Sequence, residues 1–135
     1  MFQLSKKVEY ALLALRYMAS GARGQIFTSK EIADRNQLSY DLLAKVMQKL
    51  VRKGFIQSHQ GVHGGYVLAR DAAEIKIAAV INAMEERPAV TILQCEAGNE
   101  EDCSIHSTCT IKNPLMKIQD SINKVFEDLS ILEMV

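Results

Sequence analysis

The stretch TSKEIADRNQLSYDLLAKVMQKLVRKGFIQSHQGVHGGYVLAR, residues 28–70, predicts two helices followed by a β-hairpin. Its first four letters, TSKE, match a capping box and start a short helix over about residues 28–35. After the break NQLS, Ser39 is placed to cap a further helix over residues 39–53, with apolar positions at helical spacing and Gly54 to end it. A short turn between two helices, the second rich in basic residues, is typical of a DNA-binding helix-turn-helix.

The hairpin follows directly after the second helix. Its β-prone runs FIQSH and YVLAR are separated by QGVHGG, in which Gly61, Gly64 and Gly65 allow the positive φ values that a tight hairpin needs. A plain solvated hairpin is one interpretation of this pattern. Its position behind a helix-turn-helix favours the other, a wing that contacts DNA.

In such an arrangement the 39–53 helix would enter the major groove and the hairpin tip would lie over the adjacent minor groove. Hydroxyl, amide, imidazole and cationic side chains at these places can donate hydrogen bonds to bases or phosphates. The expected DNA-binding residues are Thr28, Ser29, Ser39, Tyr40, Lys45, Lys49, Arg52, Lys53, His59, Gln60, His63, Gly64 and Gly65.

The charge distribution agrees with a polyanionic partner. Residues 1–70 contain eleven Lys/Arg and four Asp/Glu, a formal charge of +7, whereas residues 71–135 contain five and twelve, a charge of −7. The basic half includes the expected DNA surface, and the acidic half is expected to face away from the DNA.

Composition excludes several classes of protein. With 48% hydrophobic and 24% charged residues, the chain of 135 residues is neither disordered nor collagen-like. It contains no apolar run of membrane-spanning length and no signal peptide, so we expect a cytoplasmic protein without a membrane partner. It also lacks a nucleophile–base pair or a glycine loop in a phosphate-binding context, so we expect no enzyme.

The flanking segments are predicted to be helical. Apolar spacing indicates a helix over residues 5–20 and another over residues 71–86, and Pro114 suits the first turn of a helix that follows a cysteine-rich segment. That last helix has a heptad stripe, which must pack either within its own chain or against a second copy. The expected dimerisation residues are Leu115, Ile118, Ile122, Val125, Leu129 and Leu132.

The expected fold is mainly α with a small β-hairpin. We divide it into a winged helix-turn-helix domain (residues 1–86), a cysteine segment (residues 87–113) and a dimerisation helix (residues 114–135).

The cysteine segment contains the stretch CEAGNEEDCSIHSTC, residues 95–109, with all three cysteines of the chain. An odd number of clustered cysteines argues against a disulfide framework and favours a thiolate site in a reducing compartment. Cys95, Cys103, His106 and Cys109 could bind zinc as three sulfurs and one nitrogen. A metal-free thiol switch is the alternative, although the neighbouring acids would raise the pKa of a thiol there.

The order of these features resembles a known family. The opening LSKKVEYALLAL, the wing GGYVLAR and three cysteines directly before the last long helix are similar to the IscR/NsrR/RirA-type bacterial regulators. The cysteine spacing is nearest to the RirA and NsrR patterns. The resemblance implies a homodimeric winged-helix transcription regulator on a palindromic duplex operator, controlled by an iron–sulfur cluster that senses iron, nitric oxide or redox state.

The resemblance also bears on the ligands of that cluster. Cys95, Cys103 and Cys109 would supply three thiolates, which suit iron, and a fourth ligand is needed. In the IscR pattern it is a histidine three residues after the last cysteine, where this chain has Lys112. In the NsrR pattern it is a carboxylate on the first helix of the partner subunit, which corresponds to Glu9; His106 is the local alternative. We expect a 4Fe-4S cluster, with 2Fe-2S also open.

Overall fold

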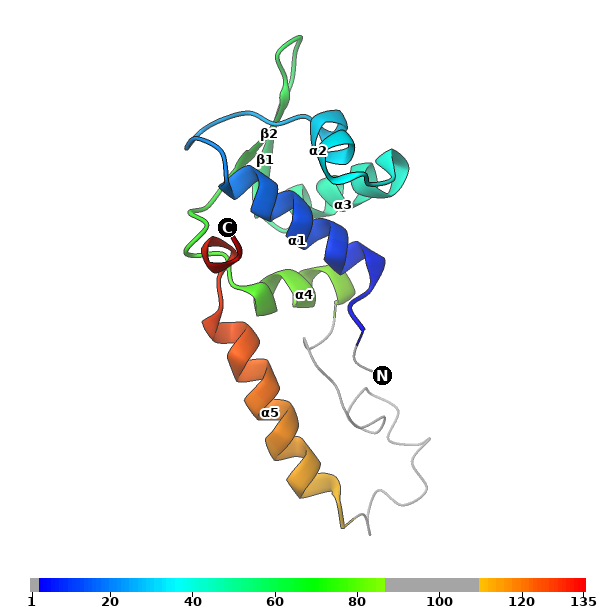
Figure 1. Cartoon of the computed structure of the whole chain (residues 1–135), viewed down its shortest axis with the longest axis vertical. Helices are drawn as coiled ribbons and strands as arrows, with labels where there is room; N and C mark the ends of the chain where they lie inside the picture. Colours follow the sequence, from blue (N-terminus) through cyan, green and yellow to red (C-terminus); the bar gives the residue numbers. More distant parts are fainter. Residues whose placement is uncertain (1–2, 87–109) are drawn as a thin grey trace.

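The computed structural model describes residues 3–86 and 110–135 (Figure 1). Within these ranges the fold is mainly α-helical with one two-stranded antiparallel sheet, as the sequence predicted. No helix in the described ranges is long and apolar enough to span a membrane. The elements, in chain order, are α1 (Lys6–Ala19), α2 (Ser29–Asn36), α3 (Tyr40–Arg52), β1 (Ile56–His59), β2 (Gly65–Leu68), α4 (Ile77–Glu85), α5 (Lys112–Asp128) and the 3-10 helix η3 (Ile131–Met134).

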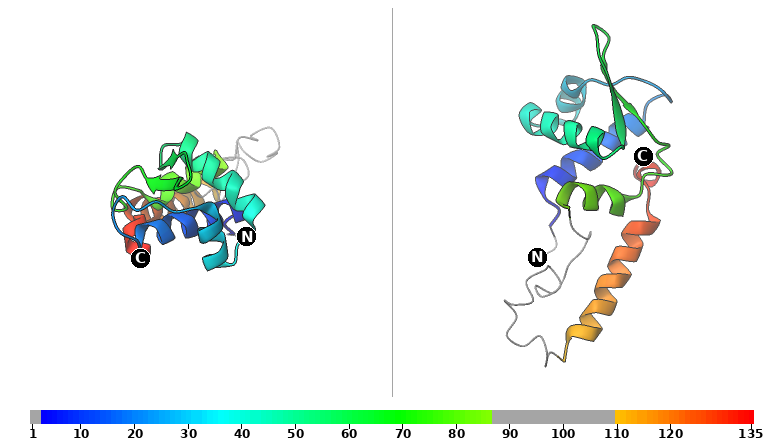
Figure 2. Two further views of the ribbon diagram at one scale, coloured as in Figure 1. Left: turned by 90° about the horizontal axis from the view of Figure 1, so that it is seen from above. Right: turned by 180° about the vertical axis from the view of Figure 1, so that it is seen from behind.

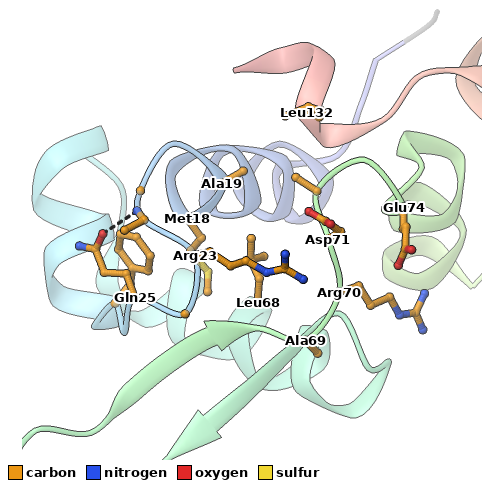
Figure 3. A pocket seen from close by; sticks show the side chains of 15 residues that line it. Met18, Ala19, Arg23, Gln25, Leu68, Ala69, Arg70, Asp71, Glu74 and Leu132 are labelled. Atoms are coloured by element: carbon orange, nitrogen blue, oxygen red, sulfur yellow. Dashed lines mark hydrogen bonds between the residues drawn. The ribbon is translucent and has the colours of Figure 1, made fainter.

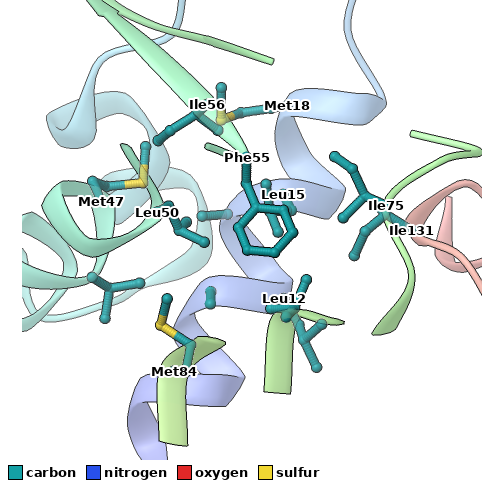
Figure 4. Packing of buried hydrophobic residues seen from close by; sticks show 14 of the residues in the cluster. Leu12, Leu15, Met18, Met47, Leu50, Phe55, Ile56, Ile75, Met84 and Ile131 are labelled. Carbon is teal, nitrogen blue, oxygen red and sulfur yellow. The ribbon is translucent and has the colours of Figure 1, made fainter. Parts of the chain in front are cut away.

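Helix α1 is the centre of the hydrophobic core. It contacts α3, α4 and η3, so that the helix-turn-helix and α4 lie on different sides of it (Figures 1 and 2). Its buried face includes Leu12, Leu15 and Met18, which pack with Phe55 at the start of the hairpin and with Ile131 near the chain end (Figure 4). Because these apolar side chains recur every three or four residues, one face of α1 is buried along its length.

Helices α2 and α3 confirm the predicted helix-turn-helix. Helix α3 buries Leu43, Val46 and Leu50, as its apolar spacing indicated. Gly54, at φ +83, follows its end in a left-handed conformation that glycine adopts without strain. The predicted turn is tight because Gln37 also adopts a left-handed conformation.

The hairpin pairs β1 with β2 in the register Ile56↔Leu68 to His59↔Gly65. The far side of β2 has a partner that the sequence did not indicate. Phe27 and Tyr66 exchange two backbone hydrogen bonds, with N···O distances of 2.8 and 2.6 Å. The base of the wing is therefore fixed to the chain just before α2, while its tip projects away from the core (Figure 1).

Helix α4 is shorter than the predicted helix over residues 71–86, because it begins only at Ile77. The backbone before Ile77 instead forms hydrogen bonds with the C-terminal end of the chain. The N–H of Ile77 donates to Leu129 O at 2.9 Å, and Ile75 O accepts from Ile131 N at 2.9 Å. These bonds hold Lys76 in an extended conformation opposite Ser130, which a helix does not allow, and residues 72–74 form a turn before it.

The predicted helix over residues 114–135 needs two corrections. It starts earlier, at Lys112, and ends at Asp128, so Leu129 and Leu132 do not lie on it. The chain bends because Ile131 enters the core, where it is fully buried, and because Ser130 and Glu133 form a capping box that starts η3. The last turn of the predicted helix is therefore absent, because Ile131 is buried in the core instead.

Replacing Ile131 with alanine should lower the free energy of unfolding by about 2–5 kcal/mol, because it leaves a cavity in the core. Chemical denaturation monitored by circular dichroism measures this loss. Val135→Ala is the matched control, since Val135 is exposed at the same end of the chain and should change stability by less than about 0.5 kcal/mol. Equal effects of the two substitutions would contradict the observed burial.

Candidate DNA interface and cluster site

The start of α2 is fixed by a cap and by α1. Thr28 accepts a hydrogen bond from the N–H of Glu31 at 3.1 Å, as the capping box predicted. The Glu31 carboxylate accepts instead from the Tyr17 hydroxyl on α1, at 3.0 Å. Desolvation, together with this carboxylate, raises the pKa of Tyr17 above its ordinary value. Thr28 and Ser29 are thus held at one edge of the helix-turn-helix.

The start of α3 is also tied to α1. Ser39 occupies the N-cap position, but its side chain makes no capping bond within the described residues. Its N–H donates to the hydroxyl of Tyr10 at 3.0 Å, a contact across 29 positions of sequence that no local pattern could reveal. Tyr40, the first residue of α3, is exposed, so the beginning of the helix is accessible to a duplex.

The basic residues of α3 do not all face solvent. Lys45, Arg52 and Lys53 are exposed, as a phosphate-contacting surface requires. Lys49 turns toward α4, where its ammonium lies 2.8 Å from Met84 O and 3.5 Å from a Glu86 carboxylate oxygen. With only 20% of its side chain exposed, Lys49 does not share the surface of the other three.

The wing tip is exposed at His59, Gln60 and His63, as predicted. Val62 between them is 97% exposed. It was not among the predicted site residues, and a minor groove could accommodate its apolar side chain. From the sequence, we expected positive φ values at Gly61, Gly64 and Gly65 of the wing. Among them the structure gives a positive φ to Gly61 alone.

Gly64 and Gly65 have a different role. They are half-buried, and a Cβ on Gly65 would meet Phe27 O at 2.5 Å. Because the strand at Phe27 approaches so closely, glycine is needed there for packing rather than for a left-handed turn. The two glycines shape the wing and present little side-chain chemistry to DNA.

Glu9 lies on the exposed side of α1, with 44% of its side chain accessible, and pairs with Lys6 at 3.0 Å. Such an exposed pair is weak and can be exchanged for another partner. The other expected ligands, Cys95, Cys103, Cys109 and His106, lie outside the described residues. Among residues 3–86 and 110–135, no three His, Cys, Asp or Glu side chains are grouped closely enough to hold a metal ion.

The two described ends of the cysteine segment lie far apart in the fold. Glu86 follows α4 next to the start of α1, where the Ser5 hydroxyl donates to the Glu85 carboxylate. Helix α5 starts at its end remote from α1 (Figures 1 and 2). The segment therefore connects the core to the outer end of α5.

Helix α5 has no buried residue in the described chain. On its heptad stripe, Ile118 is 51% and Val125 is 56% exposed, while Leu115 and Ile122 are half-buried. Packing within the chain, one of the two interpretations of this stripe, thus covers it only in part. An apolar helix face of this kind is typical of an interface.

A surface pocket of about 390 Å³ lies between the end of α1, the loop before α2, the end of β2 and η3 (Figure 3). Arg23, Arg70, Asp71 and Glu74 line it, so it contains charges of both signs. Among the predicted site residues that the structure describes, only Leu132 lines it. The pocket is therefore separate from the expected DNA surface.

Comparison with known proteins agrees with this geometry. The chain is 27% identical over 133 residues to the HTH-type transcriptional regulator NsrR of Shouchella clausii (strain KSM-K16), covering 98% of this chain and 88% of that protein. It superposes on CymR, the global cysteine regulator of B. subtilis, with a TM-score of 0.78, 24% identity and coverage of 99% and 96% of the two chains.

Two further solved structures are similar. They are IscR of T. potens (TM-score 0.74, 25% identity, 98% of this chain and 85% of that one) and the oxidised form of Staphylococcus aureus CymR (TM-score 0.73, 25% identity, 98% and 95%). The profile of the Rrf2 family, described as an iron-dependent transcriptional regulator, matches residues 4–135. Members of this family bind DNA and are not enzymes. A winged helix-turn-helix with an exposed α3 and a family match over almost its whole length make this chain a member of the Rrf2 family of transcription regulators.

Proposed function

We propose that the protein is a homodimeric regulator whose operator affinity is controlled by an iron–sulfur cluster bound by Cys95, Cys103, Cys109 and Glu9 of the partner subunit. The observation that carries this proposal is the position of Glu9. Its side chain is 44% accessible on α1, and the hydroxyl of the next residue, Tyr10, accepts a hydrogen bond from the N–H of Ser39, the N-cap of the recognition helix α3. A ligand at Glu9 would thus act on a helix that already contacts the DNA-binding element.

The donor set fits such a cluster. Three thiolates suit iron, and a carboxylate completes the four ligands as a hard, weakly held donor. Glu9 can serve because its only described ion pair, with Lys6, is solvent-exposed and costs little to break. When bound, the cluster would supply an iron- and redox-dependent link between the cysteine segment and α1.

The direction of α5 supports ligation by the partner subunit. Helix α5 begins at Lys112, shortly after Cys109, and this start lies at the end of α5 that is remote from α1 of the same chain (Figure 1). A second copy packed along the exposed α5 stripe would place its own α1 on that side. The proposal therefore joins the dimer and the cluster in one arrangement, in which each subunit completes the site of the other.

On DNA, each subunit would place the start of α3 in the major groove of one half-site. Tyr40 and Lys45 would reach bases or phosphates, and Arg52 and Lys53 would contribute charge to the backbone contact. Two subunits related by symmetry would read a palindrome with half-sites about one helical turn apart. Lys49 is left out of this surface because it contacts α4.

Replacing Lys45 with methionine should weaken operator binding and reduce its salt dependence. Each lost phosphate contact lowers the magnitude of the slope of log K against log salt by about 0.9. A dimer that loses one contact per subunit should therefore show a slope smaller by about 2. Fluorescence anisotropy over a range of salt concentrations measures this slope. Lys124→Met on α5 removes an equally exposed charge outside the DNA surface and should leave the slope unchanged; an equal fall in both variants would mean that only net charge matters.

The cluster is tested on wild-type protein purified without oxygen. Iron and acid-labile sulfide in similar amounts, with visible absorbance that disappears on chelation, support the proposal. Protein that contains zinc but no sulfide would contradict the cluster and favour the zinc site of three sulfurs and one nitrogen.

A metal-free thiol switch is the second candidate, favoured by the similarity to CymR, one structure of which is an oxidised form. In that case DNA affinity would respond to reversible thiol oxidation, and no iron would be present.

A further inference from the structure

Lys49 belongs to the recognition helix α3 but makes its contacts at the end of α4. Its ammonium donates to Met84 O at 2.8 Å, one of the carbonyls that have no partner within a helix. It also pairs with Glu86, which adopts φ 58, a left-handed conformation that residues other than glycine rarely adopt. A cation at this place stabilises both the open carbonyl and the negative end of the helix dipole.

The end of α4 is also the beginning of the cysteine segment, since Glu86 is the last described residue before it. The same end is joined to α1 through the hydrogen bond from Ser5 to Glu85. A change in the backbone conformation at Glu86 would therefore directly alter the contacts of the Lys49 ammonium.

The recognition helix is thus held near both ends by the elements that flank the proposed sensing site. At its start, Ser39 N binds Tyr10 of α1, next to Glu9. Near its end, Lys49 binds α4. A contact that only contributed charge to DNA would leave Lys49 exposed, and the observed 20% exposure argues against that role.

From this geometry we infer that Lys49 is a positioning residue that couples the end of α4 to the orientation of the recognition helix. DNA binding and the conformation at the root of the cysteine segment then influence each other through Lys49. Because such coupling is reciprocal, it can be measured from the DNA side. The inference rests on the proposed function only in taking the iron–sulfur cluster as the signal that acts on the end of α4.

The experiment is amide hydrogen exchange on the full-length protein, free and bound to a duplex selected from a random-sequence pool. In wild type, DNA should slow exchange of the amides of Asn82–Glu86, at the end of α4, by about tenfold. In Lys49→Met, which keeps the length of the side chain without its charge, this DNA-dependent slowing should fall below about twofold. Unchanged slowing in Lys49→Met would overturn the inference, as would wild type without any slowing there.

Three further variants separate coupling from folding and from charge. Lys49→Arg can donate to both partners and should restore the slowing. Glu86→Gln changes an exposed side chain, so it should fold normally and lose part of the slowing. Lys45→Met should bind DNA more weakly yet keep the slowing once saturated; loss of slowing in this variant too would mean that the effect reports occupancy alone. The measurement needs DNA binding but no cluster, so a protein without iron would contradict the proposed function and leave this test intact.

Discussion

Replacing Cys103 with alanine is expected to yield a protein without an iron–sulfur cluster and without cluster-dependent binding to its operator. The substitution leaves two thiolates and a weak carboxylate, which cannot hold the iron. Loss of an outer-shell partner alone weakens metal binding about 10- to 100-fold, and loss of a direct ligand should weaken it further. Iron and sulfide per chain, measured on protein purified without oxygen, should fall more than about tenfold.

The control is Ser104→Ala, a neighbouring substitution that removes a hydroxyl and no expected ligand. It should keep the iron, the sulfide and the visible absorbance of wild type. Equal loss in Ser104→Ala would show that the segment tolerates no change and that Cys103 has no special role. Iron retained in Cys103→Ala would remove this cysteine from the ligand set.

The same assay separates the two roles open to Glu9. If Glu9 is a ligand, Glu9→Gln should bind a cluster that is lost in air about tenfold faster, because an amide is a poorer donor than a carboxylate. Lys6→Gln removes only the described ion-pair partner of Glu9 and should behave as wild type. Matching lifetimes in Glu9→Gln and wild type would assign Glu9 to the solvated helix surface, with His106 as the next candidate.

Replacing Ile118 with glutamate should separate the subunits and weaken operator binding. Ile118 is half exposed in a single chain and lies on the α5 stripe, so a dimer would bury two copies of it. Because only the exposed half of each copy is newly buried, each contributes about 0.75–1.5 kcal/mol, and the two together correspond to about a 10- to 100-fold change in the dimer dissociation constant. Sedimentation velocity over a range of concentrations measures this constant, and an unpaired carboxylate in the interface adds to the effect.

Lys124→Gln is the matched control for this experiment. It changes the charge by the same single unit at an exposed position of α5 off the stripe and should leave the dimer intact. A wild-type protein that is monomeric at all concentrations would contradict the proposed interface. Dimers that persist in Ile118→Glu would place the interface elsewhere.

The helix-turn-helix and the wing were predictable because their signals are local. The spacing of Leu43, Val46 and Leu50 in the sequence predicts the helix that buries them, and Gly54 marks its end. The same holds for α1 and for the hairpin strands. For the candidate site, the exposure of Lys45, Arg52 and the wing tip followed from the same patterns.

The errors arose where a residue has a partner far away in sequence. In the sequence, Lys49 is equivalent to its basic neighbours, but in the fold its ammonium contacts the end of α4, 35 positions on, rather than the surface that we expect to bind DNA. Gly65 looked like a turn glycine, whereas the close strand at Phe27 is what excludes a side chain there. In both cases the cause is a contact that periodicity does not encode.

By itself, the sequence determined the winged helix-turn-helix, its basic surface and the chemistry available in the cysteine segment, because these depend on residue type and on spacing within one element. The tertiary structure alone decided that α5 ends at Asp128. The heptad stripe would continue through Leu129 and Leu132, but the core offers a buried place to Ile131 and backbone partners at Ile75 and Ile77. Burial in a shared core outweighs one more turn of an amphipathic helix, because that turn would leave its apolar residues in water.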